Sequence, residues 1–497
     1  MHGPSSSHTA GSYRIGRMAR HLLGEKPRAV TFSFDPGGSY AMVYRQQGVD
    51  LAFAAGIMEW PITDDRFDDA LIEAEREGIR LDFRVIELTD ASHPNTVLIQ
   101  MEGISGGKLE IVGRSTGGGG VALVQLDGDA FHLDGKAFEI VVQAPDSVKP
   151  KLEQAAAGQG WSKSSAGAES PLMVFRSEER PDKSIIESLN ALDGVRVRVG
   201  EPVFFTKKGS FLYEDYAGML GASESYNRSL GETCLAAEGR LLGLHRDEVV
   251  KEALERFRIM RQSVERGMDP SQVRMQLLRP TAHKVMQAEA QGRTAVGGMP
   301  TRAAARAMAV MHISNSQGTV CAAPTGGSAG TIPGVMTTLA AEFGVEGERL
   351  ARSLMAAGAV GWLIARQSTF AAEVAGCQVE IGAAGAMAAA AVVDAFGGDA
   401  RQAADAAAIA LQNSMGSVCD LVQGMCEVPC HTRNAVAAAS AFVCADLILG
   451  GYENPVPLNE TIDAVDSVGR MLPVELRCTA RGGLAVCPSA KSLPLLR

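Results

Sequence analysis

The spacing of apolar and polar residues changes twice along the chain and so divides it into three segments. Up to about residue 135, apolar runs of strand length alternate with helical stretches and Gly-rich turns, as in an α/β domain. The expected strands are residues 29–34, 79–88, 96–101 and 109–112, and the expected helices are residues 12–23 and 64–77. We therefore predict an N-terminal α/β domain over residues 1–135.

Residues 136–205 form a second, smaller segment with a regular alternation of elements. Strands are expected at residues 138–143, 172–175 and 195–199, with helices at residues 146–157 and 182–191. This order is typical of a ferredoxin-like or ACT-like α+β module. Such a module can bind a regulatory ligand, but it can also be a spacer that docks the two larger parts, and the sequence leaves both interpretations open.

From residue 206 to residue 497 the apolar residues recur at three- and four-residue spacing, which predicts an all-α domain. The expected helices are residues 246–267, 301–314, 350–367, 380–396, 400–412 and 433–449. Residues 382–393 are apolar on nearly every side, so this helix is expected inside the bundle. The whole chain is therefore predicted to be an α+β multidomain protein.

Charge and composition exclude several classes of protein. The chain has 497 residues and a net charge of −10, with no basic patch that would favour a nucleic-acid partner. Its first residues lack the basic and then apolar order of a signal peptide. The longest apolar run, residues 382–393, is shorter than the roughly 20 residues of a membrane span. We expect a soluble cytoplasmic protein, whose nine cysteines are reduced and serve metal binding or packing.

Three cysteines lie at expected helix ends or in loops of the last segment: Cys377, Cys419 and Cys430. There a thiolate gains from unpaired amides and from helix partial charge, and such amides can also tune an iron–sulfur group. Buried free cysteines of a helical core fit the pattern equally well, and no Cys-x-x-Cys spacing is present. Cys426 lies between two of the three and could compete as a ligand. The cysteines interpreted as core residues are Cys234, Cys321, Cys444 and Cys478.

Two loops carry candidate binding residues. The first is the run Ser5, Ser6, Ser7, His8 and Thr9, which suits carboxylate and ammonium recognition and contains an imidazole that could transfer a proton. A helix N-cap and turn would explain the same residues. The second loop could hold a carboxylate on backbone amides before a helix, or could be a plain turn; it contains Thr325, Gly326, Gly327 and Ser328. Asn315 and Arg433 are further substrate-binding candidates, although structural hydrogen bonding explains buried polar residues as well.

Five motifs occur together and in one order along the chain. They are Gly3-Pro4-Ser5-Ser6-Ser7-His8-Thr9, Cys321-Ala322-Ala323-Pro324-Thr325-Gly326-Gly327-Ser328, Gly376-Cys377-Gln378, Cys419-Asp420, and Val428-Pro429-Cys430 with Arg433-Asn434. With these motifs the chain resembles the iron–sulfur-dependent L-serine dehydratase (L-serine ammonia-lyase) family, with β and α domains fused. The resemblance covers residues 1–135 and about 211–490, and ACT-type modules are a familiar addition in that family.

The resemblance implies a [4Fe–4S] cluster on Cys377, Cys419 and Cys430, with the Ser-rich loop of the β domain against it. It implies β-elimination of L-serine to pyruvate and ammonia, in which an open iron acts as Lewis acid and a nearby base removes the α-proton. Some family members place a C-terminal cysteine on the fourth iron, which makes Cys487 a candidate tail ligand, although ten residues follow it here. The expected partners are a small amino-acid substrate and a second copy in a homodimer, and the expected role is amino-acid degradation for gluconeogenesis.

The sequence departs from the family in the β domain. Where the family has a Gly-His-Gly-Thr-Asp run, this chain reads Gln46-Gln47-Gly48-Val49-Asp50, and an amide cannot act as acid or base near neutral pH. The substrate could therefore be another β-hydroxy or β-substituted amino acid, or the chain could be a non-catalytic paralogue that senses a ligand. A pyridoxal-phosphate enzyme needs a lysine, and none occurs between Lys284 and Lys491, where most of the motifs lie.

Overall fold

The computed structural model describes residues 1–89, 91–164, 171–225 and 229–496. The chain forms two compact units. We call Ser7–Lys208 the strand unit, and Met1–Ser6 together with Gly209–Arg497 the helical unit. Sheets in the first unit and many helices in the second confirm the predicted α+β multidomain class.

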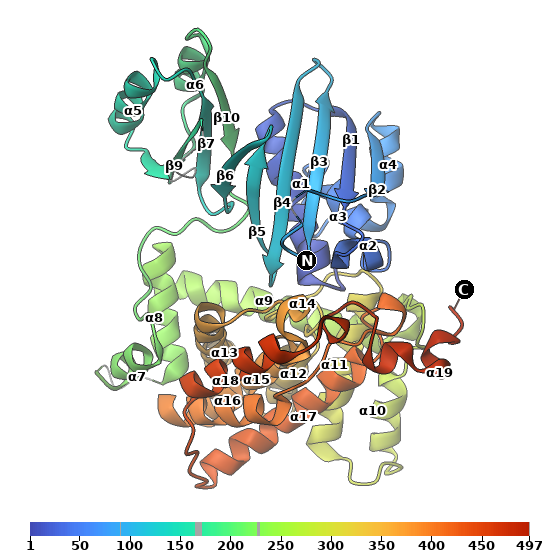
Figure 1. The fold of residues 1–497 in the computed structure, drawn as a ribbon. Coiled ribbons are helices and arrows are strands. Elements are labelled where there is room, and N and C mark those ends of the chain that lie inside the picture. The colour runs from blue at the N-terminus through green and yellow to red at the C-terminus, as the bar shows by residue number, and fades with distance from the viewer. Residues whose placement is uncertain (90, 165–170, 226–228, 497) are drawn as a thin grey trace. The chain divides into compact units, whose positions relative to one another are not determined.

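A six-stranded mixed sheet forms the first part of the strand unit, in the order β2-β1-β3-β4-β5-β6 (Figure 1). Only β1 and β2 are parallel, and the other neighbours are antiparallel. Phe32, Ile99 and Ile111 lie in one cross-strand row and are fully buried, so they fix the register of the three central strands. The strands are β1 (Pro27–Phe34), β2 (Arg80–Val85), β3 (Thr96–Gly103), β4 (Lys108–Gly117), β5 (Gly120–Leu126) and β6 (Asp129–Leu133).

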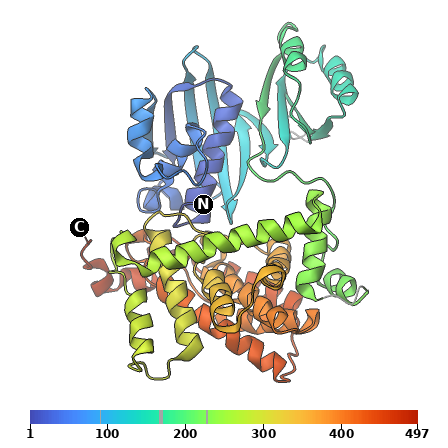
Figure 2. The same ribbon diagram turned by 180° about the vertical axis from the view of Figure 1, so that it is seen from behind.

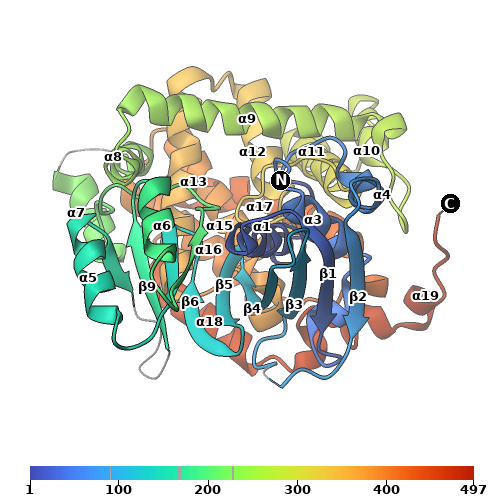
Figure 3. The same cartoon turned by 90° about the horizontal axis from the view of Figure 1, so that it is seen from above.

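Helices α1 (Gly11–Leu23) and α3 (Val49–Ile57) pack against each other and share the core of this sheet (Figure 3). Their backbones approach closely, because a Cβ at Gly56 would lie 2.2 Å from the Tyr13 carbonyl oxygen. The short helices α2 (Ser39–Val43) and α4 (Ala70–Arg76) complete this part. The helix predicted from residue 64 begins only at Ala70, after a 3-10 turn at Phe67–Asp69.

A second, four-stranded sheet has the order β10-β7-β9-β8, and all of its strand pairs are antiparallel. Its elements follow the chain order β-α-β-β-α-β, which is that of ferredoxin-like modules. The elements are β7 (Phe138–Gln143), α5 (Lys149–Gly158), β8 (Ser162–Ser164), β9 (Leu172–Ser177), α6 (Lys183–Asn190) and β10 (Arg196–Gly200). Among the described residues of this module, the polar three-residue strand β8 is the element that the sequence pattern did not predict, and an ACT-like ligand site stays a prediction.

Glu139 carries a buried carboxyl group on β7. The carboxylate accepts backbone hydrogen bonds from Asp134 (3.2 Å) and Gly135 (3.3 Å), and Arg176 lies 3.3 Å away. Burial nevertheless raises the pKa of Glu139 from 4.5 to about 7, because the charged form loses its solvation by water. The folded chain therefore holds this proton more tightly than the unfolded chain. The resulting stabilisation is present below about pH 4.5 and is lost as the pH rises through about 7.

We predict that Glu139→Gln stabilises the second sheet at pH 8 more than at pH 5, by up to about 3 kcal/mol. Glutamine keeps an oxygen acceptor for the backbone amides but has no charge to bury. The measurement is amide hydrogen exchange of β7 in the variant and the wild type, compared at each pH. The exposed Glu178 gives the matched control Glu178→Gln. A gain for Glu139→Gln that is equal at both pH values would contradict the prediction.

The helical unit consists of helices and short 3-10 turns (Figures 1 and 2). The long helix α9 packs across α11, α12 and α13 (Figure 2). The helices are α7 (Tyr216–Ser225), α8 (Leu230–Leu242), α9 (Arg246–Met268), α10 (Ala282–Ala290), α11 (Gly298–Asn315), α12 (Thr331–Phe343), α13 (Gly347–Gln367), α14 (Ala372–Ala375), α15 (Ile381–Ala395), α16 (Ala400–Ser414), α17 (Cys430–Leu449), α18 (Leu458–Met471) and α19 (Pro488–Lys491).

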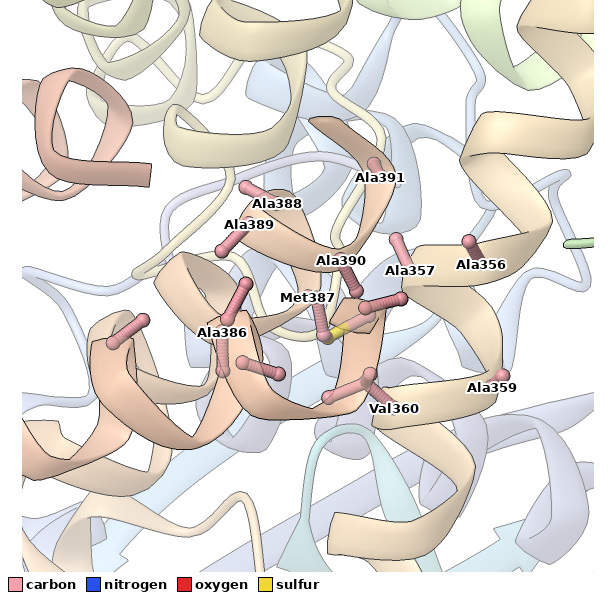
Figure 4. Packing of buried hydrophobic residues seen from close by; sticks show 14 of the residues in the cluster. Ala356, Ala357, Ala359, Val360, Ala386, Met387, Ala388, Ala389, Ala390 and Ala391 are labelled. Atoms are coloured by element: carbon pink, nitrogen blue, oxygen red, sulfur yellow. The ribbon is translucent and has the colours of Figure 1, made fainter. Parts of the chain in front are cut away.

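Helix α15 lies at the centre of this unit, as its apolar sequence predicts. All of its residues are buried, and it packs against α13, α16 and α17. The contact with α13 consists mostly of alanines together with Met387 and Val360 (Figure 4). A Cβ at Gly361 would lie 2.8 Å from Met387 Cε, so the small residue makes room for the larger one. Small side chains thus allow the central helix to be surrounded on every side.

Two helical stretches of the described residues are long and apolar enough to cross a membrane, by length and composition alone. The first, Cys377–Ala395, has 94% of its apolar window buried inside the fold. The second, Cys430–Leu449, has 44% buried. The burial of the first stretch, which contains α15, is that of a core helix.

Candidate functional site

Five buried cysteines gather in one apolar cluster of the helical unit. Cys377 begins a 3-10 turn just before α15, and Cys430 is the first residue of α17. Cys419 precedes α17 and shares a thiol–thiol hydrogen bond with Cys377. Two further thiols join them, since Cys426 hydrogen-bonds with Cys430 and Cys478 hydrogen-bonds with Cys419. The structure therefore brings together the three candidate ligands and adds Cys478, which the sequence had suggested only as a core residue.

A positive charge lies beside these thiols. Arg433 Nη1 donates to Cys377 Sγ at 3.5 Å and to the Val418 carbonyl at 2.7 Å, and Arg433 Nη2 lies 3.0 Å from Asp420 Oδ1. The thiol of Cys419 and the guanidinium of Arg433 lower the pKa of Cys377, because both stabilise its thiolate. The thiolate is the form that binds a metal, so this environment favours soft-metal binding at Cys377.

Two buried carboxyl groups border the thiols, and the sequence analysis missed both. Glu380 and Glu373 flank Cys377 in the chain and are only 9% and 6% exposed. Burial raises the pKa of Glu380 well above its usual value, and the charges of Cys377 and Glu373 add to this effect. Glu380 also hydrogen-bonds with Thr325. An acidic residue between Cys377 and a run of alanines is the signal that could have identified Glu380.

The Gly-rich loop before α12 is held in place by Asn434 of α17. Asn434 Oδ1 accepts hydrogen bonds from the backbone amides of Gly330 (3.2 Å) and Thr331 (3.1 Å). Its Nδ2 donates to the carbonyls of Gly327 (2.9 Å) and Cys430 (2.9 Å). One amide side chain thus links the loop to a candidate ligand, and an Oε atom of Glu380 lies close to Gly327 on the other side.

The first six residues of the chain belong to the helical unit. The N-terminal ammonium group of Met1 donates to the Val320 carbonyl, and the Val320 amide donates to the Met1 carbonyl, both at 2.9 Å. Ser6 Oγ accepts from the Gly326 amide at 2.9 Å. A Cβ at Gly326 would lie 2.7 Å from the Pro4 carbonyl oxygen. The start of the Ser-rich run therefore lies directly on the Gly-rich loop, so two motifs that are far apart in the sequence meet here.

The rest of the Ser-rich run lies in the strand unit. His8 Nε2 is 2.9 Å from Ser39 Oγ, and burial lowers the pKa of His8 to about 3, so this imidazole is neutral at physiological pH. Thr9 Oγ1 donates to the Gln47 carbonyl at 2.9 Å. Ser7 Oγ is buried and has no hydrogen-bond partner among the described residues. A buried hydroxyl without a hydrogen-bond partner can donate to a ligand.

Two other candidates lie apart from the thiols. Asn315 donates to the Met311 carbonyl at 3.0 Å, a hydrogen bond within its own helix α11. Cys487 is half-buried, and its Sγ lies 3.9 Å from the Gly483 carbonyl. The tail that carries Cys487 is nonetheless anchored beside Cys419, since the Leu484 amide donates to Asp420 Oδ2 at 2.9 Å.

A cavity of about 280 Å³ lies between α15, α16 and α17 and reaches Cys377 and Arg433. Small residues line it, among them Gly385, Ala410 and Ser440. Its size suits a small polar molecule rather than a nucleotide.

The donor set, thiols with a guanidinium beside them, has the chemistry that an iron–sulfur group needs. The part of the chain that the structure describes contains no group of three His, Cys, Asp or Glu side chains arranged around one metal ion. Thiols contributed by three separate segments, with a guanidinium beside them, suit the larger iron–sulfur group, which is held by cysteine thiolates. Cys377, Cys419 and Cys430 are the residues that would hold it.

Comparison with known proteins gives a consistent result. The family model described as "Serine dehydratase alpha chain" matches residues 153–485. The probable L-serine dehydratase alpha chain of Bacillus subtilis is 34% identical over 264 residues, which is 53% of this chain and 88% of that one. The corresponding protein of Latilactobacillus sakei is 40% identical over 189 residues, 38% of this chain and 90% of that one. The probable L-serine dehydratase beta chain of Bacillus subtilis is 41% identical over 142 residues, 29% of this chain and 63% of that one.

Proposed function

Because this chain belongs to the serine dehydratase alpha chain family, we propose that it is an L-serine ammonia-lyase with a [4Fe–4S] cluster on Cys377, Cys419 and Cys430. The observation that carries the proposal is the meeting of these thiols with Arg433 in one buried cluster. When bound, such a cluster supplies a Lewis-acidic iron that assists departure of the serine hydroxyl. Thiols that must stay reduced are consistent with a cytoplasmic enzyme.

The chain's own residues then bind and orient the amino acid. The amides of the Gly-rich loop and the hydroxyls of Ser5 and Ser6 suit its carboxylate, since they lie side by side in the helical unit. Ser7, His8 and Thr9 belong to the strand unit, and the resemblance alone makes them candidate catalytic residues. The resemblance makes His8 the proposed proton-transfer group, although burial lowers its pKa to about 3 and its neutral imidazole is therefore a weak base in this structure.

The elimination balances without an oxidant. The α C–H and β C–O bonds break, a C=C bond forms, and the hydroxyl leaves as water with one proton. The enamine then tautomerises, and water hydrolyses the imine to pyruvate and ammonia. The protein must therefore hold one proton during the step.

Anaerobic reconstitution of the full-length protein with iron and sulfide, followed by an assay for pyruvate from L-serine, tests the proposal. We expect visible absorbance of a cluster and production of pyruvate. Absorbance with a 2-oxo acid formed from another amino acid, but not from serine, would favour the alternative substrate. Absorbance without turnover of any β-hydroxy or β-substituted amino acid would favour a ligand sensor.

Gln47 is the observation that keeps another substrate under consideration. Gln47 is fully buried, and its carbonyl accepts a hydrogen bond from Thr9. At this position the family that the sequence resembles has a histidine. We predict that Gln47→His raises kcat/KM for L-serine roughly 10²-fold, the lower end of what a proton-transfer group contributes. The matched control is Gln46→His, whose side chain is only half-buried. Unchanged serine turnover in Gln47→His would show that this position does not determine substrate choice.

A further inference from the structure

We propose that Cys478 is the fourth thiolate ligand of the cluster, and that it, rather than Cys487 of the tail, caps the iron left open by Cys377, Cys419 and Cys430. The proposal deepens the proposed function and rests on it. It assigns a metal-binding role to a residue that neither the sequence pattern nor the resemblance singles out.

The first reason is contact. The Cys478 thiol is 6% exposed and hydrogen-bonds with the Cys419 thiol, which in turn hydrogen-bonds with Cys377. Cys478 is also close enough to Cys377 for their charges to interact. Cys478 therefore belongs to the same row of thiols as two proposed ligands, and it reaches them from a different segment of the chain.

The second reason is the backbone around Cys478. The Cys419 amide donates to the Leu476 carbonyl at 2.9 Å, and the Cys478 amide donates to the Cys419 carbonyl at 2.9 Å. With these two hydrogen bonds, the backbones of Arg477 and Cys419 form an isolated parallel β-bridge. The pair of hydrogen bonds fixes Cys478 against Cys419 independently of their side chains.

Cys478 also has an unusual conformation, with φ of +60°. This left-handed region is unfavourable for a residue with a Cβ, which is why glycine or asparagine usually occupies it. Non-glycine residues held in this way cluster at functional sites, where the surrounding structure enforces a required direction of the side chain. Here the enforced direction brings a thiol to Cys419.

Cys487 and Cys426 are less suited to this role. Cys487 is half-buried, and its contact is with the carbonyl of Gly483, in the turn that precedes it. Cys426 hydrogen-bonds with Cys430, which lies four residues further along the chain. Binding of Cys478 breaks its S–H bond, releases the proton and forms an S–Fe bond, with no change in oxidation state. Serine would have to displace this thiolate before it could reach the iron.

Iron retention during mild oxidation tests the assignment. Wild type, Cys478→Ser, Cys487→Ser and Cys426→Ser are reconstituted anaerobically with iron and sulfide and then treated with limited ferricyanide. The readouts are iron per chain and the electron paramagnetic resonance signal of a three-iron cluster. We expect wild type and Cys487→Ser to keep about four irons, and Cys478→Ser to fall to about three and to show the three-iron signal, as a cluster with an open iron does.

Several results would overturn the inference. Loss of iron from wild type as readily as from Cys478→Ser would show that the fourth iron is uncapped. A three-iron signal in Cys487→Ser or Cys426→Ser, but not in Cys478→Ser, would assign the ligand elsewhere. The wild-type measurement decides even if Cys478→Ser fails to fold, because a capped cluster must resist oxidation. Absence of any cluster from wild type would overturn the proposed function as well. A cluster that forms but loses its fourth iron in wild type would overturn only the assignment of Cys478.

Discussion

Replacing Cys377, Cys419 or Cys430 individually with alanine is expected to abolish both the cluster and the formation of pyruvate. Each variant removes a thiolate from one of the three segments that meet beside Arg433, and an iron–sulfur cluster is held by cysteine thiolates. Lewis-acid assistance is worth several kcal/mol, so serine turnover should fall on the order of 10³-fold or more. Visible absorbance and iron content after anaerobic reconstitution check the first effect, and a pyruvate assay checks the second.

The control for these variants is Cys444→Ala. Cys444 is a buried cysteine of α17 that packs in the alanine-rich core, away from the cluster of thiols. Its replacement costs some packing but should leave iron content and absorbance unchanged. Retention of the absorbance in all three ligand variants would refute the cluster assignment. A loss in Cys444→Ala as large as in the others would show that the assay reports folding rather than ligation.

Local motifs explain why the sequence could single out the three candidate ligands that the structure brings into one cluster. Cys377, Cys419 and Cys430 each lie in a short motif at the end of a helix or in a loop. The residues of such a motif are enough to predict the local turn. The apolar run of α15 likewise predicts its own burial, because a helix without a polar side has no stable place at the surface. These inferences depend only on neighbours within a few residues.

What could not be predicted depends on contacts between distant segments. Cys478 looks like a core cysteine until the hydrogen bonds to Cys419 are known. Glu380 looks like the charged end of a helix until burial and Thr325 enclose it. The assignment of residues 1–6 to the helical unit was missed for the same reason, since nothing in Met1–Ser6 indicates pairing with Val320 or Gly326.

The same long-range contacts separate two requirements of the proposed reaction. In the proposed reaction the thiols would bind the metal, whereas the Gly-rich loop and Ser6 would bind the substrate. Asn434 joins the two, because it bonds with both Cys430 and Gly327. A change confined to the loop should therefore affect substrate use and leave the cluster intact.

Gly326→Ala is the change that tests this separation. A Cβ at this position would lie 2.7 Å from the Pro4 carbonyl oxygen and 3.0 Å from the Ser5 amide nitrogen, both of them backbone atoms. The N-terminal segment must shift to relieve the clash, and Ser6 then loses its hydrogen bond with the Gly326 amide. Misplacement of a binding group by about 1 Å can cost about 10²-fold in rate. We therefore expect kcat/KM for L-serine to fall about 10²-fold while iron content and absorbance stay at wild-type values.

Gly385→Ala supplies the matched comparison, because a Cβ there would make only an ordinary contact of 3.7 Å with Ala437. It lies on α15, beside the cavity that reaches Cys377, and alanine also favours a helix more than glycine does. Its kcat/KM should remain within about twofold of wild type, because the added methyl group would meet only an ordinary van der Waals contact. If Gly326→Ala lost its cluster together with its activity, the loop would be part of the metal site. If Gly326→Ala kept full activity, the contact between the Ser-rich run and the Gly-rich loop would have no role in catalysis.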